Sequence, residues 1–154
     1  EDAPICEALC EASNDGVTID VIARGFCCLR PGIAGLTENV RVRSIVGRFL
    51  EHARVFYFAN GQEDPLDGDY YLGSADWMYR NFFRRIEVCF PILDDKLKKR
   101  IIKEGLEPYL KDNVNAWEML PDSSYRLRSA RRGNHFCAQT HLAVEYGQDL
   151  PVES

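Results

Sequence analysis

The feature that most constrains the fold is a pair of aromatic, apolar runs separated by a turn-rich segment. Residues 54–59 and 70–73 contain the β-branched and aromatic side chains that are typical of strands. Residues 60–69 between them are rich in Asn, Gly, Pro and Asp, which favour turns. This pattern predicts an antiparallel hairpin. If Ala59 pairs with Tyr70, the start of the first strand meets the residues that follow the second.

Polar side chains gather at that open end of the predicted hairpin. His52 and Arg54 are two residues apart, as are Ser74 and Asp76, so each pair shares one face of an extended chain. An imidazole, a guanidinium, a hydroxyl and a carboxylate would then converge at a sheet edge. Such a grouping suits phosphate chemistry better than simple packing.

The rest of the chain predicts an α/β fold with a mixed central sheet flanked by helices. Apolar residues at helical spacing and short apolar runs indicate where helices and strands lie. The expected helices are 4–14, 94–111 and 136–146, with a helical turn at 48–51 and a turn or short helix at 77–85. The expected strands are 17–23, 40–46, 86–92 and 116–120, and 121–133 is expected to be a basic loop. No repeat or linker divides the chain, so we expect one domain over residues 1–154.

Arginine is unevenly distributed in this acidic chain. The net charge of −5 argues against a general polyanion binder. Residues 24–54 nevertheless contain six arginines, no lysine and only two acids, the arginines being at positions 24, 30, 41, 43, 48 and 54. Arginine without lysine favours bidentate contacts to phosphate or carboxylate groups. The pattern therefore predicts a local basic face, with scattered surface charge as the alternative.

The cysteines, the apolar runs and the first residues of the chain indicate its cellular compartment. We expect the six cysteines to be reduced, buried thiols. Their spacing contains no Cys-x-x-Cys pair, so no metal site is expected.

No apolar run approaches the roughly 18 residues of a membrane-spanning helix, and the start has no signal sequence. We therefore expect a cytoplasmic protein, with a peripheral position at the inner membrane face as an open alternative. The first residue is Glu rather than Met, which favours a piece of a longer protein.

Three long motifs resemble a known family. They are Ala23-Arg-Gly-Phe-Cys-Cys-Leu-Arg-Pro-Gly-Ile33, Glu38-Asn-Val-Arg-Val-Arg-Ser-Ile-Val-Gly-Arg-Phe-Leu-Glu-His52 and Gly73-Ser-Ala-Asp-Trp-Met-Tyr-Arg-Asn81, the last followed by Arg85-Ile-Glu87. In this order they resemble the C-terminal part of bacterial polyphosphate kinase. The similarity runs continuously from about residue 7 to residue 146.

The resemblance implies a fold, an activity and partners. The family transfers the terminal phosphate of ATP to inorganic polyphosphate, reversibly, through a phosphohistidine. This chain is similar to the second of two phospholipase D-like domains, and the phosphorylated histidine belongs to the first. Mg²⁺ is the implied cofactor, with its ligands outside residues 1–154. The implied partners are ATP or ADP, inorganic polyphosphate and the remaining domains of the same chain, in a homo-oligomer and without specific nucleic acid binding.

Carried over to this sequence, the resemblance marks Arg24 and His52 as residues that face the nucleotide phosphates. Arg24 would neutralise charge on the transferring phosphoryl group, and His52, the expected catalytic residue, would donate a proton or a hydrogen bond to a phosphate oxygen. Asp76 is expected to orient His52 by accepting its second ring proton. Further candidates for contacts with the phosphates are Arg54, Ser74, Asp76, Arg80 and Arg85.

Two other functions are compatible with parts of the sequence. The isolated chain could act as a module that binds polyphosphate or nucleic acid through its arginines. A phosphodiesterase of the phospholipase D type is the other alternative. That family uses His-x-Lys-x₄-Asp followed by Gly-Ser-x-Asn. Here Arg54, Ala59 and Asp76 stand where those motifs have Lys, Asp and Asn, which disfavours a hydrolase.

Overall fold

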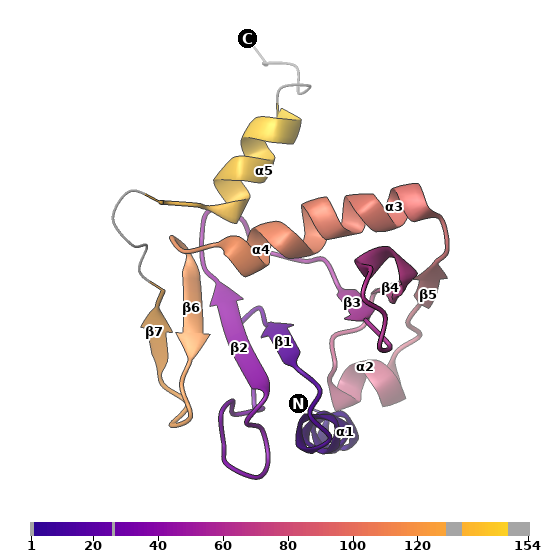
Figure 1. Ribbon diagram of the computed structural model, residues 1–154, viewed down its shortest axis with the longest axis vertical. Helices are drawn as coiled ribbons and strands as arrows, with labels where there is room; N and C mark the ends of the chain where they lie inside the picture. Colours follow the sequence, from indigo (N-terminus) through magenta and orange to yellow (C-terminus); the bar gives the residue numbers. More distant parts are fainter. Residues whose placement is uncertain (1, 26, 129–133, 148–154) are drawn as a thin grey trace.

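The computed structural model describes residues 2–25, 27–128 and 134–147, and it has the expected α/β class (Figure 1). One sheet has the strand order β1 (Ile19–Ile22), β2 (Val40–Ile45), β6 (Ala116–Met119) and β7 (Tyr125–Leu127). In this sheet β1 and β2 are parallel and the other neighbours are antiparallel. A second, antiparallel sheet contains β3 (Val55–Phe58), β4 (Asp69–Gly73) and β5 (Cys89–Ile92). The strands are thus divided between a mixed and an antiparallel sheet.

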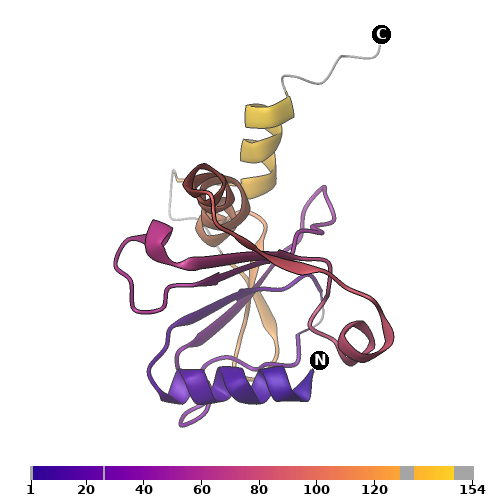
Figure 2. The same ribbon diagram turned by 90° about the vertical axis from the view of Figure 1, so that its right-hand side faces the viewer.

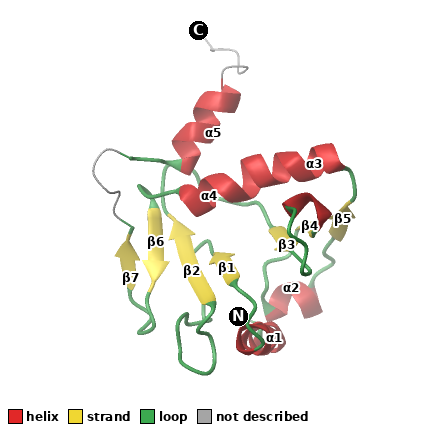
Figure 3. Cartoon of the chain, in the orientation of Figure 1, coloured by secondary structure: helices red, strands yellow, loops and turns green. Residues whose placement is uncertain are grey.

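Helices lie on both sides of the strands (Figures 2 and 3). Helix α1 (Ala3–Asn14) lies on one side. On the other side a continuous helical stretch comprises α3 (Asp95–Arg100), a π-helical turn η2 (Ile101–Leu106) and α4 (Glu107–Lys111), followed later by α5 (Ala138–Tyr146). Two short elements are the 3₁₀ turn η1 (Pro65–Asp67) and α2 (Tyr79–Arg84). Across the described ranges, no helix has both the length and the apolar character that crossing a membrane requires.

The main apolar core lies between α1 and the first sheet. Asp2 caps the helix by accepting a hydrogen bond from the backbone of Ile5 at 3.3 Å, and Gly16 ends the turn after it at a φ of 88°. The apolar side of α1 then covers the first sheet. The buried cluster consists of Leu29, Val40, Val42 and Met119, with Cys6, Leu9 and Cys10 of α1 packed against it.

The opposite face of β2 carries two arginines with different surroundings. Arg41 is exposed, whereas only 8% of Arg43 is exposed. Arg43 donates from NH1 to the carbonyl of Leu110 in α4 at 2.7 Å, and from NH2 to Asp20 at 3.0 Å. Because α4 covers this side of the sheet, Arg43 is a buried structural cation. The prediction that Arg43 contributes to a basic surface is therefore wrong.

The hairpin is present, but its register differs from the expected one. Val55 pairs with Leu72 and Phe58 with Asp69, so Tyr70 lies opposite Tyr57 rather than opposite Ala59. The stacked rings of Tyr57 and Tyr70, with centroids 4.8 Å apart, accompany this pairing. The ladder continues one step further, where the backbone N–H of Gly73 donates to the carbonyl of Arg54 at 3.1 Å.

Two further expectations about local structure are wrong. Residues 48–51 are irregular, with a bend over residues 47–49, rather than a helical turn, because the side chain of Gln139 bonds both backbone groups of Phe49, at 3.0 and 2.7 Å. The expected loop at 121–133 contains β7, because a turn at Asp122 and Ser124 brings the chain back onto β6. Residues 129–133 of that loop lie outside the described residues.

The expected helices 4–14, 94–111 and 136–146 are confirmed as α1, α3 to α4 and α5, and 77–85 contains the short α2. The expected strands 17–23, 40–46, 86–92 and 116–120 are confirmed as β1, β2, β5 and β6 with shorter bounds. The π-helical turn in the long helix precedes Pro108, which has no backbone N–H to continue regular bonding.

A polar corner links β4, α2 and β5. Ser74 donates a short hydrogen bond to one carboxylate oxygen of Glu87 and accepts one from the backbone of Val88 at 3.0 Å. The buried Asn81 donates to the other oxygen of Glu87 at 2.7 Å. The hydrogen bonds from Ser74 and then Asn81 lower the pKa of Glu87 below its ordinary value of 4.5.

This corner predicts a pH-dependent effect of Ser74→Ala. A depressed folded-state pKa means that ionised Glu87 contributes stability above its unfolded pKa, and that this contribution is lost as the pH falls through the folded pKa. Ser74→Ala should therefore raise the folded pKa of Glu87 and lower the free energy of unfolding more at about pH 7 than at about pH 3. NMR titration of the Glu87 carboxyl carbon and urea unfolding at both pH values measure these effects.

Ser124→Ala is the matched control, because Ser124 lowers the pKa of a different carboxylate, that of Asp122. This variant should shift the titration of Asp122 and leave Glu87 unchanged. An unaltered Glu87 titration in Ser74→Ala would contradict the account of the corner.

Candidate functional site

The structure brings Arg24 to the peptide that precedes His52. Arg24 follows β1, and its NH1 donates to the carbonyl oxygen of Glu51 at 2.7 Å. That carbonyl and the backbone nitrogen of His52 belong to one peptide group. The Arg24 guanidinium therefore lies at the backbone next to His52, although the two residues are 28 positions apart in the sequence, and both residues are exposed.

Glu51 is itself held by two helices. Its Oε2 accepts a hydrogen bond from the hydroxyl of Tyr109 in α4 at 2.9 Å, and its Oε1 accepts one from Gln139 in α5 at 2.7 Å. Burial, followed by the contact with Glu51, raises the pKa of Tyr109, so the phenol remains a donor. The carboxylate thus fixes the peptide that Arg24 contacts.

Gln139 ties the segment before His52 to α5. Besides Glu51, its amide bonds both backbone groups of Phe49, and the side chain is only 5% exposed. Gly47 makes the close approach possible, because a Cβ there would collide with the Gln139 amide. The bends between β2 and β3 therefore have a defined position although they lack regular structure.

Arg54 contacts both the ring and the backbone of His52. Its NH1 lies 2.8 Å from Nδ1 and 3.3 Å from Nε2 of the ring, and it donates to the His52 carbonyl at 2.8 Å. A guanidinium can only donate. The shorter of the two contacts, to Nδ1, fits the tautomer of the neutral ring that carries its proton on Nε2.

Arg54 is in turn held by Asp76. Its Nε donates to Oδ1 at 3.1 Å and its NH2 lies 3.0 Å from the same oxygen, with 16% of the Arg54 side chain exposed. Exposed Arg80 approaches the other oxygen of Asp76 at 3.8 Å. Asp76 was expected to accept a proton from His52 directly. Instead, Arg54 lies between them and uses Nε, NH1 and NH2 for protein acceptors.

The other candidates take two different positions. The Ser74 hydroxyl is engaged on both sides, by Glu87 and by Val88. Arg85 is exposed and follows the last residue of α2. The hydrogen bonds from Ser74 and Asn81 lower the pKa of Glu87 most, and the charge of Arg85 lowers it by a smaller amount. Arg24, Arg80 and Arg85 are therefore the exposed arginines among the candidates, whereas Arg54 and Ser74 are occupied by neighbouring groups.

The described residues near His52 do not fit a metal site. No group of three or more His, Cys, Asp or Glu within residues 2–25, 27–128 and 134–147 is arranged to hold a metal ion. The nearby carboxylates of Glu51, Asp76 and Glu87 already accept hydrogen bonds from protein donors. The implied Mg²⁺ therefore finds no ligand set among these residues.

Two hollows lie away from His52. One, of about 190 Å³, is lined by α1 and residues 28–37, and the other, of about 550 Å³, includes Gly25, Arg30 and Tyr125. His52 and Arg24 are instead on an open surface. An extended anion could reach them there without entering a cavity.

Sequence reasoning missed the residues that fix this edge. Glu51 adjoins His52, but its glutamate side chain gives no sign of a partner in α4 or α5. Gln139 is separated from Phe49 by 90 positions, and no local pattern links them. Only the packing of α5 against the segment after β2 reveals their role.

Comparisons by sequence and by structure both find polyphosphate kinases. A model of the family described as polyphosphate kinase C-terminal domain 2 matches residues 1–139. The chain is 59% identical over 127 residues to the polyphosphate kinase of Burkholderia lata, covering 82% of this chain and 18% of that protein. It is 60% identical over 126 residues to the polyphosphate kinase of Neisseria gonorrhoeae, with the same coverage of 82% and 18%. A crystal structure of polyphosphate kinase from Porphyromonas gingivalis matches with a TM-score of 0.86 and 34% identity, over 96% of this chain and 22% of that one.

The chain spans about 18% of the length of the curated relatives it matches. The structural match confirms the expected phospholipase D-like α/β fold. The family model covers most of the chain, and the motifs that carried the resemblance lie within it. This chain belongs to the polyphosphate kinase C-terminal domain 2 family.

Proposed function

We propose that this chain supplies phosphate-binding groups to an ATP:polyphosphate phosphotransferase. The complete cytoplasmic enzyme would transfer the terminal phosphate of ATP, reversibly, to inorganic polyphosphate through a phosphohistidine outside residues 1–154. Membership of the family supports this activity. The observation that supports the role of this chain is the 2.7 Å hydrogen bond from Arg24 to the carbonyl of Glu51, because it holds a guanidinium at the backbone next to His52.

Arg24 is proposed to bind phosphate oxygens during two successive displacements. In the first, the bond between the γ-phosphorus of ATP and its bridging oxygen breaks, the oxygen stays with ADP, and the phosphoryl group bonds to the histidine nitrogen. In the second, a terminal oxygen of polyphosphate displaces that nitrogen. One NH1 hydrogen of Arg24 is used by Glu51, which leaves further guanidinium donors for the oxygens on which charge accumulates.

His52 is proposed to act through the proton on Nε2. In the tautomer that accepts from Arg54 at Nδ1, the neutral ring keeps a donor at Nε2 that can bond the oxygen entering or leaving the phosphorus. The same proton can be transferred to the leaving oxygen and regained in the reverse direction. His52 is thus the proposed catalytic residue of this chain.

Arg54 and Asp76 are proposed to position His52 rather than to bind substrate. Asp76 bonds the Nε and NH2 side of the guanidinium, which leaves NH1 directed at the ring and carbonyl of His52. A ring held in one tautomer and orientation loses less entropy on reaching the transition state. Arg80 and Arg85, exposed and near this edge, are proposed to attract the polyanion.

The proposal assigns Mg²⁺ to ligands elsewhere in the longer protein. The carboxylates near His52 are engaged by Tyr109, Gln139, Arg54, Ser74 and Asn81. What this chain contributes is hydrogen bonding and positive charge.

The remaining domains of the longer protein are proposed to cover an apolar surface at α2 and β5. Phe83, Ile86, Val88 and Phe90 are exposed along this segment. Large apolar side chains that are exposed close together in the chain are typical of sites of contact with other protein. The short span of this chain within its relatives supports this assignment, and a homo-oligomer of the complete protein remains part of the proposal.

Neither alternative function has a specific observation in its favour. A polyanion-binding module would use the arginines as one surface, but Arg43 is buried and Arg54 is paired with Asp76. A phospholipase D-type hydrolase has an aspartate where this chain has Ala59 and an asparagine where it has Asp76, and Asp76 is already bonded to Arg54.

Replacing either phosphate-facing residue tests the proposed function. In the full-length polypeptide that contains this sequence, His52→Ala and Arg24→Ala should each lower ATP-dependent polyphosphate synthesis by about 10²–10³-fold. The loss follows from removal of a donor used in the transition state. Steady-state kinetics of purified variants provide the measurement, and near wild-type rates in both would refute the role of this chain.

The positioning role of Arg54 predicts a distinct kinetic result. Arg54→Lys has one donor nitrogen in place of three and does not reproduce the paired contacts with Asp76 and His52, so kcat should fall by about 10–10²-fold with little change in the KM for ATP. The ¹⁵N shifts of the His52 ring should change as well, because Nδ1 loses its donor. Kinetics and ¹⁵N NMR of selectively labelled protein measure both effects.

Arg126→Gln serves as the control, since Arg126 in β7 is exposed and pairs with Glu118 at 3.5 Å, in the other sheet. It should leave kcat and the ring shifts of His52 near the wild-type values. If Arg54→Lys raises KM alone and leaves the ring shifts intact, Arg54 binds substrate and the positioning role is wrong.

A further inference from the structure

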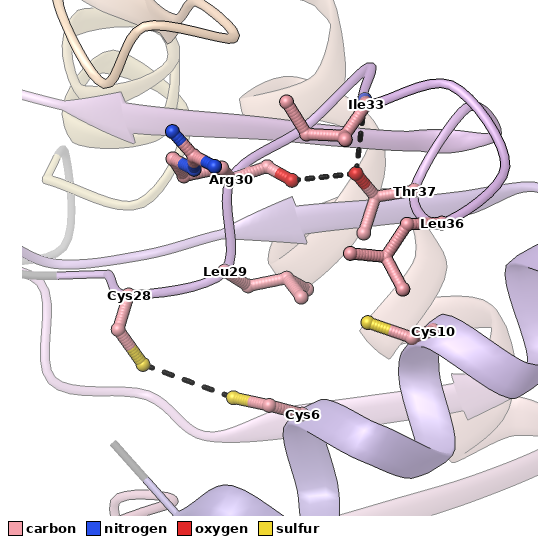
Figure 4. A pocket seen from close by; sticks show the side chains of 8 residues that line it. All are labelled: Cys6, Cys10, Cys28, Leu29, Arg30, Ile33, Leu36 and Thr37. Carbon is pink, nitrogen blue, oxygen red and sulfur yellow. Dashed lines mark hydrogen bonds between the residues drawn. The ribbon is translucent and has the colours of Figure 1, made fainter.

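Two thiols from separate parts of the chain touch each other beside the smaller hollow. Cys6 in α1 and Cys28, in the irregular segment after β1, have sulfur atoms 3.7 Å apart, and their side chains point toward one another (Figure 4). Cys28 is exposed and Cys6 is half-buried. A small reactant can therefore reach the pair from the Cys28 side.

The neighbouring cysteines are differently engaged, which makes the pair specific. Cys10 lines the same hollow one helical turn further along α1, but Cys28 makes its thiol contact with Cys6. Cys27 turns its sulfur to the carbonyl of Leu29 at 3.8 Å. Of these four thiols, Cys6 and Cys28 are thus the two that the fold places in contact.

We propose that Cys6 and Cys28 form a site of reversible oxidation that a hydroperoxide converts to a disulfide. A disulfide needs its sulfur atoms at about 2.05 Å, so the present separation must shorten. Cys28 can supply this movement, because it lies outside helix and strand and its side chain is free of packing on its exposed side. Cys6 is fixed by α1 and acts as the stationary partner.

The chemistry balances with the hydroperoxide as the oxidant. The Cys28 sulfur, after losing its proton to solvent, attacks one peroxide oxygen. The O–O bond breaks, and the product is a sulfenic acid at Cys28 together with water, or an alcohol if the peroxide is organic. The Cys6 sulfur then attacks the Cys28 sulfur, its proton leaves with the hydroxyl group as water, and the S–S bond forms.

The order of events follows from the environments of the two thiols. Burial, followed by the contact with Cys28, raises the pKa of Cys6 to about 11, so Cys6 stays protonated near neutral pH. The exposed Cys28 is then the thiol that meets the oxidant first. The resulting bond would close a ring that contains β1 and Arg24, and it would tie the segment after Arg24 to α1.

The test maps the thiols of the reduced, full-length polypeptide after brief exposure to hydrogen peroxide. Free thiols are alkylated before unfolding, and the protein is digested with trypsin, which cuts after Arg24 and after Arg41 but not between Arg30 and Pro31. Cys6 and Cys10 then lie in one peptide and Cys27 and Cys28 in another. Mass spectrometry identifies the two peptides joined with the loss of two hydrogen atoms.

The wild-type protein should give the joined peptides, and a reducing agent should separate them. Cys6→Ser and Cys28→Ser should abolish the joined species, whereas the matched controls Cys10→Ser and Cys27→Ser should retain it. Absence of joined peptides in the wild type would overturn the proposal, a result that does not depend on the folding of any variant. A joined species that persists in Cys28→Ser, or Cys28 oxidised to sulfinic acid with Cys6 free, would also overturn it.

Discussion

The guanidinium of Arg54 is the group on which the open end of the hairpin depends. The backbone carbonyl of Arg54 accepts the last hydrogen bond between β3 and β4, from the N–H of Gly73. The Arg54 side chain bonds both Asp76, which follows β4, and His52, which precedes β3. The register of β3 and β4 determines whether Arg54 can reach Asp76 at all. A one-residue slip would turn its side chain to the other face of the sheet. The geometry of His52 is thus set by strand pairing.

A second constraint comes from the far end of the chain. Gln139 bonds Phe49 and Glu51, Tyr109 bonds Glu51, and the carbonyl of Glu51 receives Arg24. Helices α4 and α5 thereby define the position of an irregular segment between the two sheets. Hydrogen bonds between buried polar side chains and backbone groups resist local opening, because each group left unpaired would cost free energy. These hydrogen bonds hold the segment before His52 in one position.

Periodicity predicted most elements, because helix and strand patterns depend on neighbouring residues. It also predicted the meeting of Arg54 with Asp76, since both flank one hairpin. It failed at the segment 48–51, where a side chain 90 positions away bonds the backbone of Phe49 and displaces a helical turn. It failed for Arg43 as well, since alternation along β2 indicates which face a residue occupies but not that α4 covers that face. Contacts of this range leave no local signal in a single sequence.

The central claim is that Arg24 and His52 face the same anion while Arg54 stays with Asp76. A crystal structure of the full-length polypeptide with a non-hydrolysable ATP analogue tests it most directly. The account predicts phosphate oxygens within hydrogen-bond distance of the Arg24 guanidinium and of Nε2 of His52, with the pairing of Arg54 and Asp76 intact. Phosphates bound away from both residues, or an Arg54 that leaves Asp76 to bind phosphate itself, would contradict it.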